Sequence, residues 1–174
     1  MPVYHSTLND LDVRTVGNIS ILPLKTRVKG PAPLCEDGKD DIIDEAIKFF
    51  RANVLFSSFE VKGNADRVLI FLTLYISQVL KRLERTKSKQ EGSKIMHQLA
   101  VESFPLPGEQ GWHLGGHIAA AKSSSERETM RSYFKQLREE TGLRMLEKVF
   151  GEDGTPNKWW LQFCKRKFMN ITVR

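Results

Sequence analysis

Hydrophobic residues are densest around residues 65–86, in the run ADRVLIFLTLYISQVLKRLER. Two interpretations fit its most apolar part, Val68–Ile76: a buried strand, or a helix that is buried on every side. The apolar pattern continues without a break through Leu80 and Leu83, and basic residues occupy the last turns, where the helix dipole favours them. We therefore expect a helix, and because it has almost no polar face, the rest of the chain must surround it.

Four further segments carry apolar residues at the three- and four-residue spacing of a helix. The first follows the acidic start at Asp40, which suits the positive end of a helix dipole. In the longest, Ser125 and Glu128 match the S-x-x-E capping box, and in the last Thr155 is placed to cap and Pro156 to occupy the first turn. The segments cover about residues 40–56, 90–101, 125–149 and 155 onwards. Together with the central helix they predict an all-α fold, a single domain of about five helices.

Two segments break this helical pattern. Residues 1–39 hold short apolar pieces interrupted by Pro23 and by the cluster Gly30–Pro33. Proline continues neither a helix nor a central strand, so we expect an extended N-terminal arm that packs along its own domain or on a partner. Residues 103–124 are rich in proline and glycine and predict a long loop, either a docking segment or an inert surface loop. The whole of 1–174 is expected to form one domain.

The chain has 174 residues and a formal net charge of +6, from 27 Lys and Arg against 21 Asp and Glu. This balance makes an acidic partner plausible without deciding the fold. Two cysteines cannot build a disulfide framework, the N-terminus has no secretory pattern, and no apolar run has the length of a membrane span. We expect a cytoplasmic protein with no membrane partner.

The sequence holds no pattern typical of a catalytic centre: a nucleophile elbow, a phosphate-binding loop and a dinucleotide fingerprint are all missing. His113 and His117 have the spacing of zinc ligands on a helix, but they lie in a glycine-rich stretch without a third ligand. The thiol of Cys164 precedes three cations that could lower its pKa, although a buried structural thiol is the better interpretation. We therefore expect a protein that is not an enzyme and has no cofactor and no metal.

The C-terminal stretch from Lys158 to Arg174 stands apart, because it combines five basic residues and four aromatic ones with no acidic residue. Three interpretations are open. Phosphate contacts and base stacking would make it a site for single-stranded RNA. An amphipathic helix with its aromatic rings inward would present the cations to an acidic protein surface, and a membrane surface is the third option. The adjacent tryptophans favour the protein interface. A smaller basic run, Lys81–Lys94, is interpreted as a solvated helix end and loop.

Several short segments, which follow one another in the same order along nearly the whole chain, resemble those of a known family. They are PVYHS, LPLK, KGPAP, DIIDEAIKFFRANVLF, ADRVLIFLTLYIS, FPLPGEQG, LREETGLRMLEKVF and NKWWLQFCKRKFMN. Together they resemble the p21-Arc family, subunit 3 of the actin-related protein 2/3 complex. Two stretches depart from that pattern, Trp112–His117 and Asn170–Arg174.

The resemblance implies a non-catalytic subunit of a seven-subunit assembly that nucleates branched actin filaments. It implies an all-helical fold with one helix wrapped by the others, and packing mainly on actin-related protein 3. In the active state it implies contact with actin-related protein 2 and a place near the mother filament. Nucleotide binding belongs to the two actin-related subunits, so no cofactor is implied here.

Because actin surfaces are acidic, the basic and aromatic residues at both ends of the chain are the expected interface. These candidates are Tyr4, His5, Lys158, Trp159, Lys165, Arg166 and Lys167. No nucleic acid is expected as a partner of such a subunit. The alternative function is a free-standing RNA-binding module that uses the same C-terminal aromatic and basic residues.

Overall fold

Five α-helices carry the fold in the computed structural model, which describes residues 3–174. They are α1 (Ile42–Asn53), α2 (Asn64–Leu83), α3 (Lys89–Val101), α4 (Ser124–Val149) and α5 (Lys158–Leu161). Two strands, β1 (Thr15–Val16) and β2 (Ile19–Ser20), form a short antiparallel pair, and two 3₁₀ turns, η1 (Gly115–His117) and η2 (Phe168–Asn170), complete the described elements. The predicted all-α class and single domain are confirmed.

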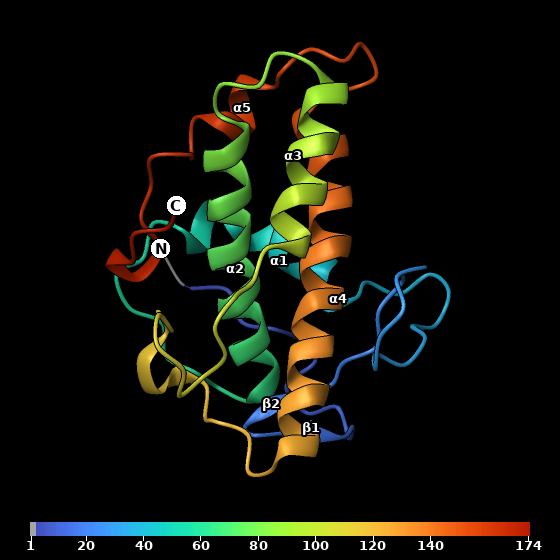
Figure 1. Ribbon diagram of the computed structural model, residues 1–174, viewed down its shortest axis with the longest axis vertical. Coiled ribbons are helices and arrows are strands. Elements are labelled where there is room, and N and C mark those ends of the chain that lie inside the picture. The colour runs from blue at the N-terminus through green and yellow to red at the C-terminus, as the bar shows by residue number, and fades with distance from the viewer. Residues whose placement is uncertain (1–2) are drawn as a thin grey trace.

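Helix α2 lies at the centre, as its sequence predicts. Figure 1 shows α2, α3 and α4 side by side along the long axis, with α1 crossing behind them. Fourteen of the twenty residues of α2 are buried, and the helix contacts each of the other four. Its observed bounds, 64–83, are close to the expected 65–86. Burial on almost every side follows from the lack of a polar face.

The N-terminal segment is attached to the domain by two buried carboxylates. Glu45 on α1 accepts hydrogen bonds from the hydroxyls of Ser6 (2.6 Å) and Thr7 (2.7 Å). Asp66 on α2, which is fully buried, accepts from the Ser6 amide at 2.8 Å. Hydrogen bonds to a buried carboxylate are stronger than neutral ones, so residues 5–7 are held at the start of both helices.

The start of α2 is capped by a residue from a distant part of the chain. The residue before the helix is Gly63, which has no side chain to cap it. Instead Asn9 accepts a hydrogen bond from the Asp66 amide at 2.9 Å, and the Asn9 side chain fills the space where a Cβ on Gly63 would lie, 2.8 Å away. A free helix amide is thereby satisfied by the N-terminal segment.

The β1–β2 hairpin and the segment after it pack on α4. Gly17 makes the turn with a φ of +59°, and a Cβ there would lie 2.8 Å from the carbonyl oxygen of Ala119. The hydroxyl of the fully buried Tyr133 accepts from the Leu22 amide at 3.0 Å and lies 3.2 Å from the Leu22 carbonyl, to which it donates. These strands were not foreseen, because two-residue strands leave no periodic signal.

An ion pair between the buried Asp41 and the half-buried Arg144 joins the start of α1 to α4. Asp41 caps α1 by accepting from the Asp44 amide at 2.9 Å, and its two oxygens each lie 2.7 Å from a guanidinium nitrogen of Arg144. Arg144 also contacts Asp44 and Glu140. Burial by itself would raise the pKa of the Asp41 carboxyl, but hydrogen bonds from Arg144 and two backbone amides hold that pKa below its ordinary value of 3.8.

Two expected helix starts are wrong. Helix α4 is capped by Ser123, which accepts from the Glu126 amide at 3.1 Å, and not by Ser125. The serine run offers the S-x-x-E pattern twice, and the helix uses the earlier copy. The last helix is capped by Asn157 and not by Thr155, whose hydroxyl donates to Asp153.

The expected amphipathic C-terminal helix is also wrong, because α5 spans a single turn. Phe163 packs edge-on against Phe50, and Phe168 packs edge-on against Phe59. In a straight helix, side chains five residues apart point about 140° apart, so both rings could not reach these positions. The chain bends after α5, and the amide of Met169 donates to the Phe56 carbonyl at 3.1 Å.

The Asp41–Arg144 pair predicts a large effect of removing the cation. Arg144→Met leaves a buried carboxylate without its partner, so the free energy of unfolding at pH 7 should fall by about 3–5 kcal/mol, measured by urea denaturation. Because the folded-state pKa of Asp41 is lowered, its contribution is complete above the ordinary pKa and is lost as the pH falls below about 4. The difference in the free energy of unfolding between the unchanged chain and Arg144→Met should therefore become smaller below about pH 4.

The matched control is Arg127→Met, since the Arg127 side chain is 55% exposed and 4.0 Å from Glu109. This change should alter the free energy of unfolding by less than about 0.5 kcal/mol. Two results would contradict an Asp41–Arg144 pair that stabilises the fold. One is an equal decrease in the free energy of unfolding in both variants, and the other is a decrease for Arg144→Met that does not change with pH.

Candidate protein interface

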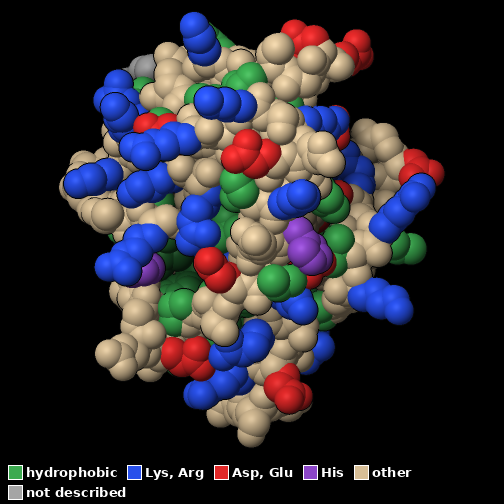
Figure 2. Space-filling view, turned by 45° about the horizontal axis from the view of Figure 1, so that its top comes forward, with side chains coloured by type: hydrophobic (Ala, Val, Ile, Leu, Met, Phe, Trp, Pro, Cys, Tyr) green, Lys and Arg blue, Asp and Glu red, His purple; other side chains and the backbone are tan. Residues whose placement is uncertain are grey.

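The C-terminal basic surface is formed by exposed residues on α5 and on the turns that follow it. Figure 2 shows Lys and Arg side chains gathered on the flank where α5 and the C-terminal segment lie, with few carboxylates among them. All five expected residues in this part of the chain are exposed: Lys158, Trp159, Lys165, Arg166 and Lys167.

The single turn of α5 points its two tryptophans in opposite directions. Asn157 accepts from the Trp159 amide at 2.8 Å and sets the start of the turn. Trp160 then packs into the core, with its ring 6.2 Å from that of Phe50, and is 7% exposed. Trp159 is 58% exposed. The contrast makes Trp160 a structural residue and leaves Trp159 free to contact a partner.

Arg51 on α1 contacts the rings of both tryptophans, which the sequence did not indicate. Its guanidinium carbon lies 4.9 Å from the centre of the Trp159 ring and 4.5 Å from that of Trp160. A cation over an indole face is attracted by the ring electrons, so Arg51 orients the exposed ring. Arg51 and the tryptophans are more than a hundred positions apart, and no local signal joins them.

The four basic residues of the surface are not engaged in ion pairs among the described residues. Within residues 3–174, Lys158, Lys165, Arg166 and Lys167 form no ion pair with a carboxylate. Unpaired cations beside an exposed aromatic ring attract an anionic surface over a distance of about one Debye length. The arrangement can therefore bind an acidic partner.

These cations do not activate the neighbouring thiol. Cys164 is half-buried, and burial together with the carboxylate of Glu84 raises the pKa of the Cys164 thiol, which outweighs the opposite effect of Lys165. The possibility that the basic run lowers this pKa is not supported.

The two candidates near the N-terminus have different surroundings. Tyr4 is 47% exposed, and its ring stacks on Phe49 of α1 at 5.1 Å between ring centres. His5 points inward, with its Nδ1 2.7 Å from Oδ2 of Asp66 and its ring edge-on to Phe59. The geometry gives Tyr4 a surface that a partner can contact, whereas His5 holds the segment on the domain.

Helix α1 lies between Tyr4 and Trp159. Tyr4 stacks on Phe49, and Trp159 lies over Arg51, two positions further along. Side chains two positions apart on a helix point about 200° apart, so the structure places these aromatic residues on different flanks of α1 and does not join them in one patch.

Two residues of the basic run Lys81–Lys94 make specific contacts, so this run is more than a solvated helix end. Lys81 Nζ donates to the Val173 carbonyl at 2.7 Å, and Arg82 Nε donates to the Arg174 carbonyl at 3.1 Å. Arg82 also pairs with Glu102 at 3.1 Å. The end of α2 thus holds the C-terminal residues in place.

The histidine pair forms no metal centre. In the part of the chain that the structure describes, no group of three or more His, Cys, Asp or Glu is arranged to hold an ion. The backbone carbonyl of His117 accepts from Arg67 Nε at 3.0 Å, which ties η1 to α2.

Across residues 3–174, no helix combines the length and apolar character that crossing a bilayer requires.

Comparison with known proteins places this arrangement in a family. The p21-Arc profile, described as the ARP2/3 complex ARPC3 (21 kDa) subunit, matches residues 1–173. Actin-related protein 2/3 complex subunit 3 of Arabidopsis thaliana is 49% identical over 98% of this chain and 99% of that protein. The subunits of the same name from Dictyostelium discoideum and Schizosaccharomyces pombe are 47% and 45% identical, each covering at least 97% of both chains. The chain therefore belongs to the p21-Arc family of ARP2/3 complex subunits.

Proposed function

We propose that this chain is a non-catalytic subunit of the actin-related protein 2/3 complex, which nucleates actin filaments as branches in the cytoplasm. The observation that carries the proposal is the family match over residues 1–173 with relatives of nearly equal length. It packs mainly on actin-related protein 3, contacts the other subunits, and in the active state bridges to actin-related protein 2 near the mother filament.

The role is conformational. A subunit with no reaction of its own shifts the equilibrium between two arrangements of the actin-related subunits when it makes contacts that exist in only one of them. A gain of about 1.4 kcal/mol in the active arrangement changes the ratio of the two states tenfold. The subunit therefore acts by favouring the filament-like arrangement.

The C-terminal basic surface supplies the charge complementarity for this contact. Lys158, Lys165, Arg166 and Lys167 are exposed like Trp159 and form no ion pair within residues 3–174, and exposed aromatic and basic residues are typical of the residues that dominate interface energies. Lys158, Lys165, Arg166 and Lys167 steer the encounter with an acidic partner, while Trp159 provides apolar area to bury. Tyr4 contributes on the other flank of α1.

Removal of the three adjacent cations near the C-terminus tests the proposed interface. Changing Lys165, Arg166 and Lys167 together to Ala should weaken incorporation into the complex roughly tenfold at about 150 mM salt, because three favourable long-range interactions are lost. Incorporation is measured by tagging the chain, isolating it from native cytosol and quantifying the co-eluting subunits by mass spectrometry. Branch formation with the isolated complex should fall in parallel.

The matched control changes Lys94, Lys135 and Lys148 to Ala, three exposed cations on α3 and α4 outside any ion pair in residues 3–174. It alters the net charge by the same amount and should leave assembly intact. If both triple variants behave alike, net charge matters and the C-terminal basic surface does not.

The second prediction separates the adjacent tryptophans. Trp159→Ala should weaken assembly while changing the free energy of unfolding by no more than about 1 kcal/mol, since only an exposed cation–ring contact is lost. Trp160→Ala removes a core ring and should cost about 3–5 kcal/mol of stability, measured by thermal or urea unfolding of the isolated chain. Assembly unaffected by Trp159→Ala would remove that residue from the proposed interface.

The same isolation of the tagged chain from cytosol also distinguishes assembly into the complex from the alternative function, RNA binding. Partners retained after nuclease treatment support the assembly role. A solitary chain, or co-elution lost on nuclease treatment, would favour RNA binding by the aromatic and basic segment.

A further inference from the structure

The loop between α4 and α5 carries a threonine that caps neither helix. Residues 150–157 form this loop, and Figure 1 shows it projecting at the end of the molecule where α5 lies. No residue from 151 to 159 is buried, and a Cβ placed on Gly154 would meet no atom within 4 Å. Thr155 therefore presents an exposed hydroxyl on a loop that extends into solvent.

Thr155 is the only hydroxyl residue of the chain that precedes a proline. The sequence holds seven prolines, and each of the others follows an apolar residue or a glycine. Lys158 comes three positions after Thr155, so the loop has the order Thr-Pro-Asn-Lys. A hydroxyl residue, then proline, then a cation two positions further is the pattern that protein kinases of the cyclin-dependent class select in a substrate.

Each part of this pattern has a physical reason. Proline has no backbone N–H, and it restricts the residue before it to extended backbone. An enzyme groove without an acceptor at this position would leave the amide of any other residue unpaired, so it selects proline. The cation further along pairs with acidic groups of the enzyme. Pro156 and Lys158 therefore give Thr155 a specificity that an isolated hydroxyl lacks.

The loop can open for an enzyme without disturbing the core. A kinase binds its substrate as an extended segment, whereas here the Asn157 amide donates to the Val149 carbonyl at 2.7 Å and the Gly154 amide to the Gly151 carbonyl at 2.9 Å. Breaking these two bonds exposes no buried side chain, because the first buried residue after the loop is Trp160. Local opening of this kind needs far less free energy than global unfolding.

A phosphate on Thr155 would change the loop itself. The hydroxyl now donates to Oδ2 of Asp153 at 2.8 Å, and the Thr155 amide donates to Oδ1 at 3.1 Å. These bonds hold the pKa of the Asp153 carboxyl below its ordinary value of 3.8. Phosphorylation removes the donated hydrogen and places a second anion next to this carboxylate. The turn then loses its hydroxyl bond, and the phosphate is repelled from Asp153.

The cations of the C-terminal basic surface begin directly after this loop. Lys158 opens α5, and it is both the cation of the kinase pattern and a member of the surface. It is exposed and forms no ion pair within residues 3–174. Charges interact across a Debye length of about 8 Å at physiological salt, so a phosphate on Thr155 would offset the attraction that Lys158 contributes.

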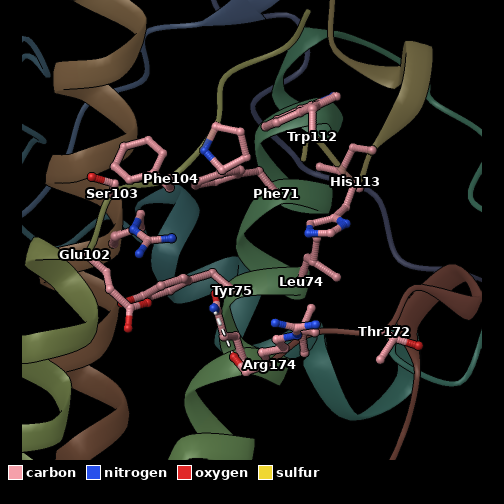
Figure 3. Close-up of a pocket in the computed structure, with 15 residues that line it drawn as sticks. Phe71, Leu74, Tyr75, Glu102, Ser103, Phe104, Trp112, His113, Thr172 and Arg174 are labelled. Carbon is pink, nitrogen blue, oxygen red and sulfur yellow. Dashed lines mark hydrogen bonds between the residues drawn. The ribbon is translucent and has the colours of Figure 1, made fainter. Parts of the chain in front are cut away.

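The segment that carries the other cations is fixed at both ends. Trp160 packs in the core at its start. At its far end, Lys81 donates to the Val173 carbonyl at 2.7 Å and Arg82 to the Arg174 carbonyl at 3.1 Å. These last residues also line a cleft of about 550 Å³ beside α2, and Figure 3 shows Arg174 at one end of it. The cations are therefore held on the domain and cannot move away with a detached tail.

We propose that Thr155 is a phosphorylation site for a proline-directed protein kinase, and that its phosphate weakens the attraction of the C-terminal basic surface for an anionic partner. The effect on assembly rests on the function proposed above, whereas the modification itself does not. The surface would thus be under the control of an enzyme that needs only the exposed loop.

The transfer step uses ATP as the phosphate donor. Oγ1 of Thr155 forms a bond to the γ-phosphorus, and the bond from that phosphorus to the bridging oxygen of ADP breaks. The hydroxyl proton passes to the catalytic carboxylate of the kinase. The product carries a charge of about −1.5 to −2 at pH 7, which cancels up to about half of the charge of the four cations.

A kinase assay on the full chain tests the site. We expect a purified cyclin-dependent kinase with its cyclin to transfer one phosphate from ATP to Thr155, located by mass spectrometry. Thr155→Ala should abolish the transfer and Thr155→Ser should retain it. Pro156→Ala should lower the rate about tenfold, because an unpaired amide then enters the enzyme groove, and Lys158→Ala should lower it several-fold. No transfer to the unchanged chain, or equal rates for Pro156→Ala, would overturn the site.

The charge effect is tested on the phosphorylated chain. It should elute from a sulfonated cation-exchange resin at lower salt than the unmodified chain, and its incorporation into the complex in cytosol with phosphatase inhibitors should be several-fold weaker. Thr155→Glu adds one negative charge and should weaken incorporation roughly threefold. The matched control is Ser125→Glu, an exposed position in the first turn of α4, which packs near β1. It should leave incorporation unchanged.

The variant with Lys165, Arg166 and Lys167 changed to Ala separates the two proposals. If it weakens incorporation and phosphorylation of Thr155 does not, the charge effect is wrong and the C-terminal basic surface stands. If neither change weakens incorporation, that surface is wrong and the charge effect with it, while the kinase assay still decides the site. Equal weakening by Thr155→Glu and Ser125→Glu would also overturn the charge effect, since net charge alone would explain it.

Discussion

Burial of α2 is the constraint on which the rest of the fold depends. A helix with so little polar surface is stable in water only when other elements cover it, and each CH₂ group removed from water contributes about 0.8 kcal/mol. Helices α1, α3 and α4 supply most of the cover, and the hairpin and the C-terminal turns supply the remainder. The face of α2 that carries Phe71 and Tyr75 borders a cleft, although Phe71 stacks on Phe134 of α4 at 4.1 Å between ring centres.

Buried carboxylates decide where the covering segments attach. Asp41, Glu45 and Asp66 lie near the starts of α1 and α2, where the helix dipole favours negative charge. The carboxylate of each also accepts a hydrogen bond from a residue far away in the chain. Apolar packing is non-directional, whereas these bonds have a defined geometry, so they set the register of the N-terminal segment and of α4 on the central helices.

Two surfaces remain after the core is complete, and they differ in physical character. The C-terminal basic surface is exposed and its cations form no ion pair within residues 3–174, so added salt should weaken its attraction for an anionic partner. The cleft beside α2 is partly apolar, and two residues that line it, Tyr75 and Arg138, each have a buried polar atom without a hydrogen-bond partner among residues 3–174.

The sequence by itself determined the fold class, a central helix over about residues 65–86 and the basic residues near the C-terminus, because composition and helical periodicity are local properties. Only the tertiary structure decided that α5 ends after one turn, that Asn9 caps α2, and that Arg51 lies under Trp159. It also turned His5 inward against Asp66 and placed Arg138 between the rings of Tyr75 and Phe104. These features depend on residues tens of positions apart, whose packing overrides local preference, and no local pattern records such contacts.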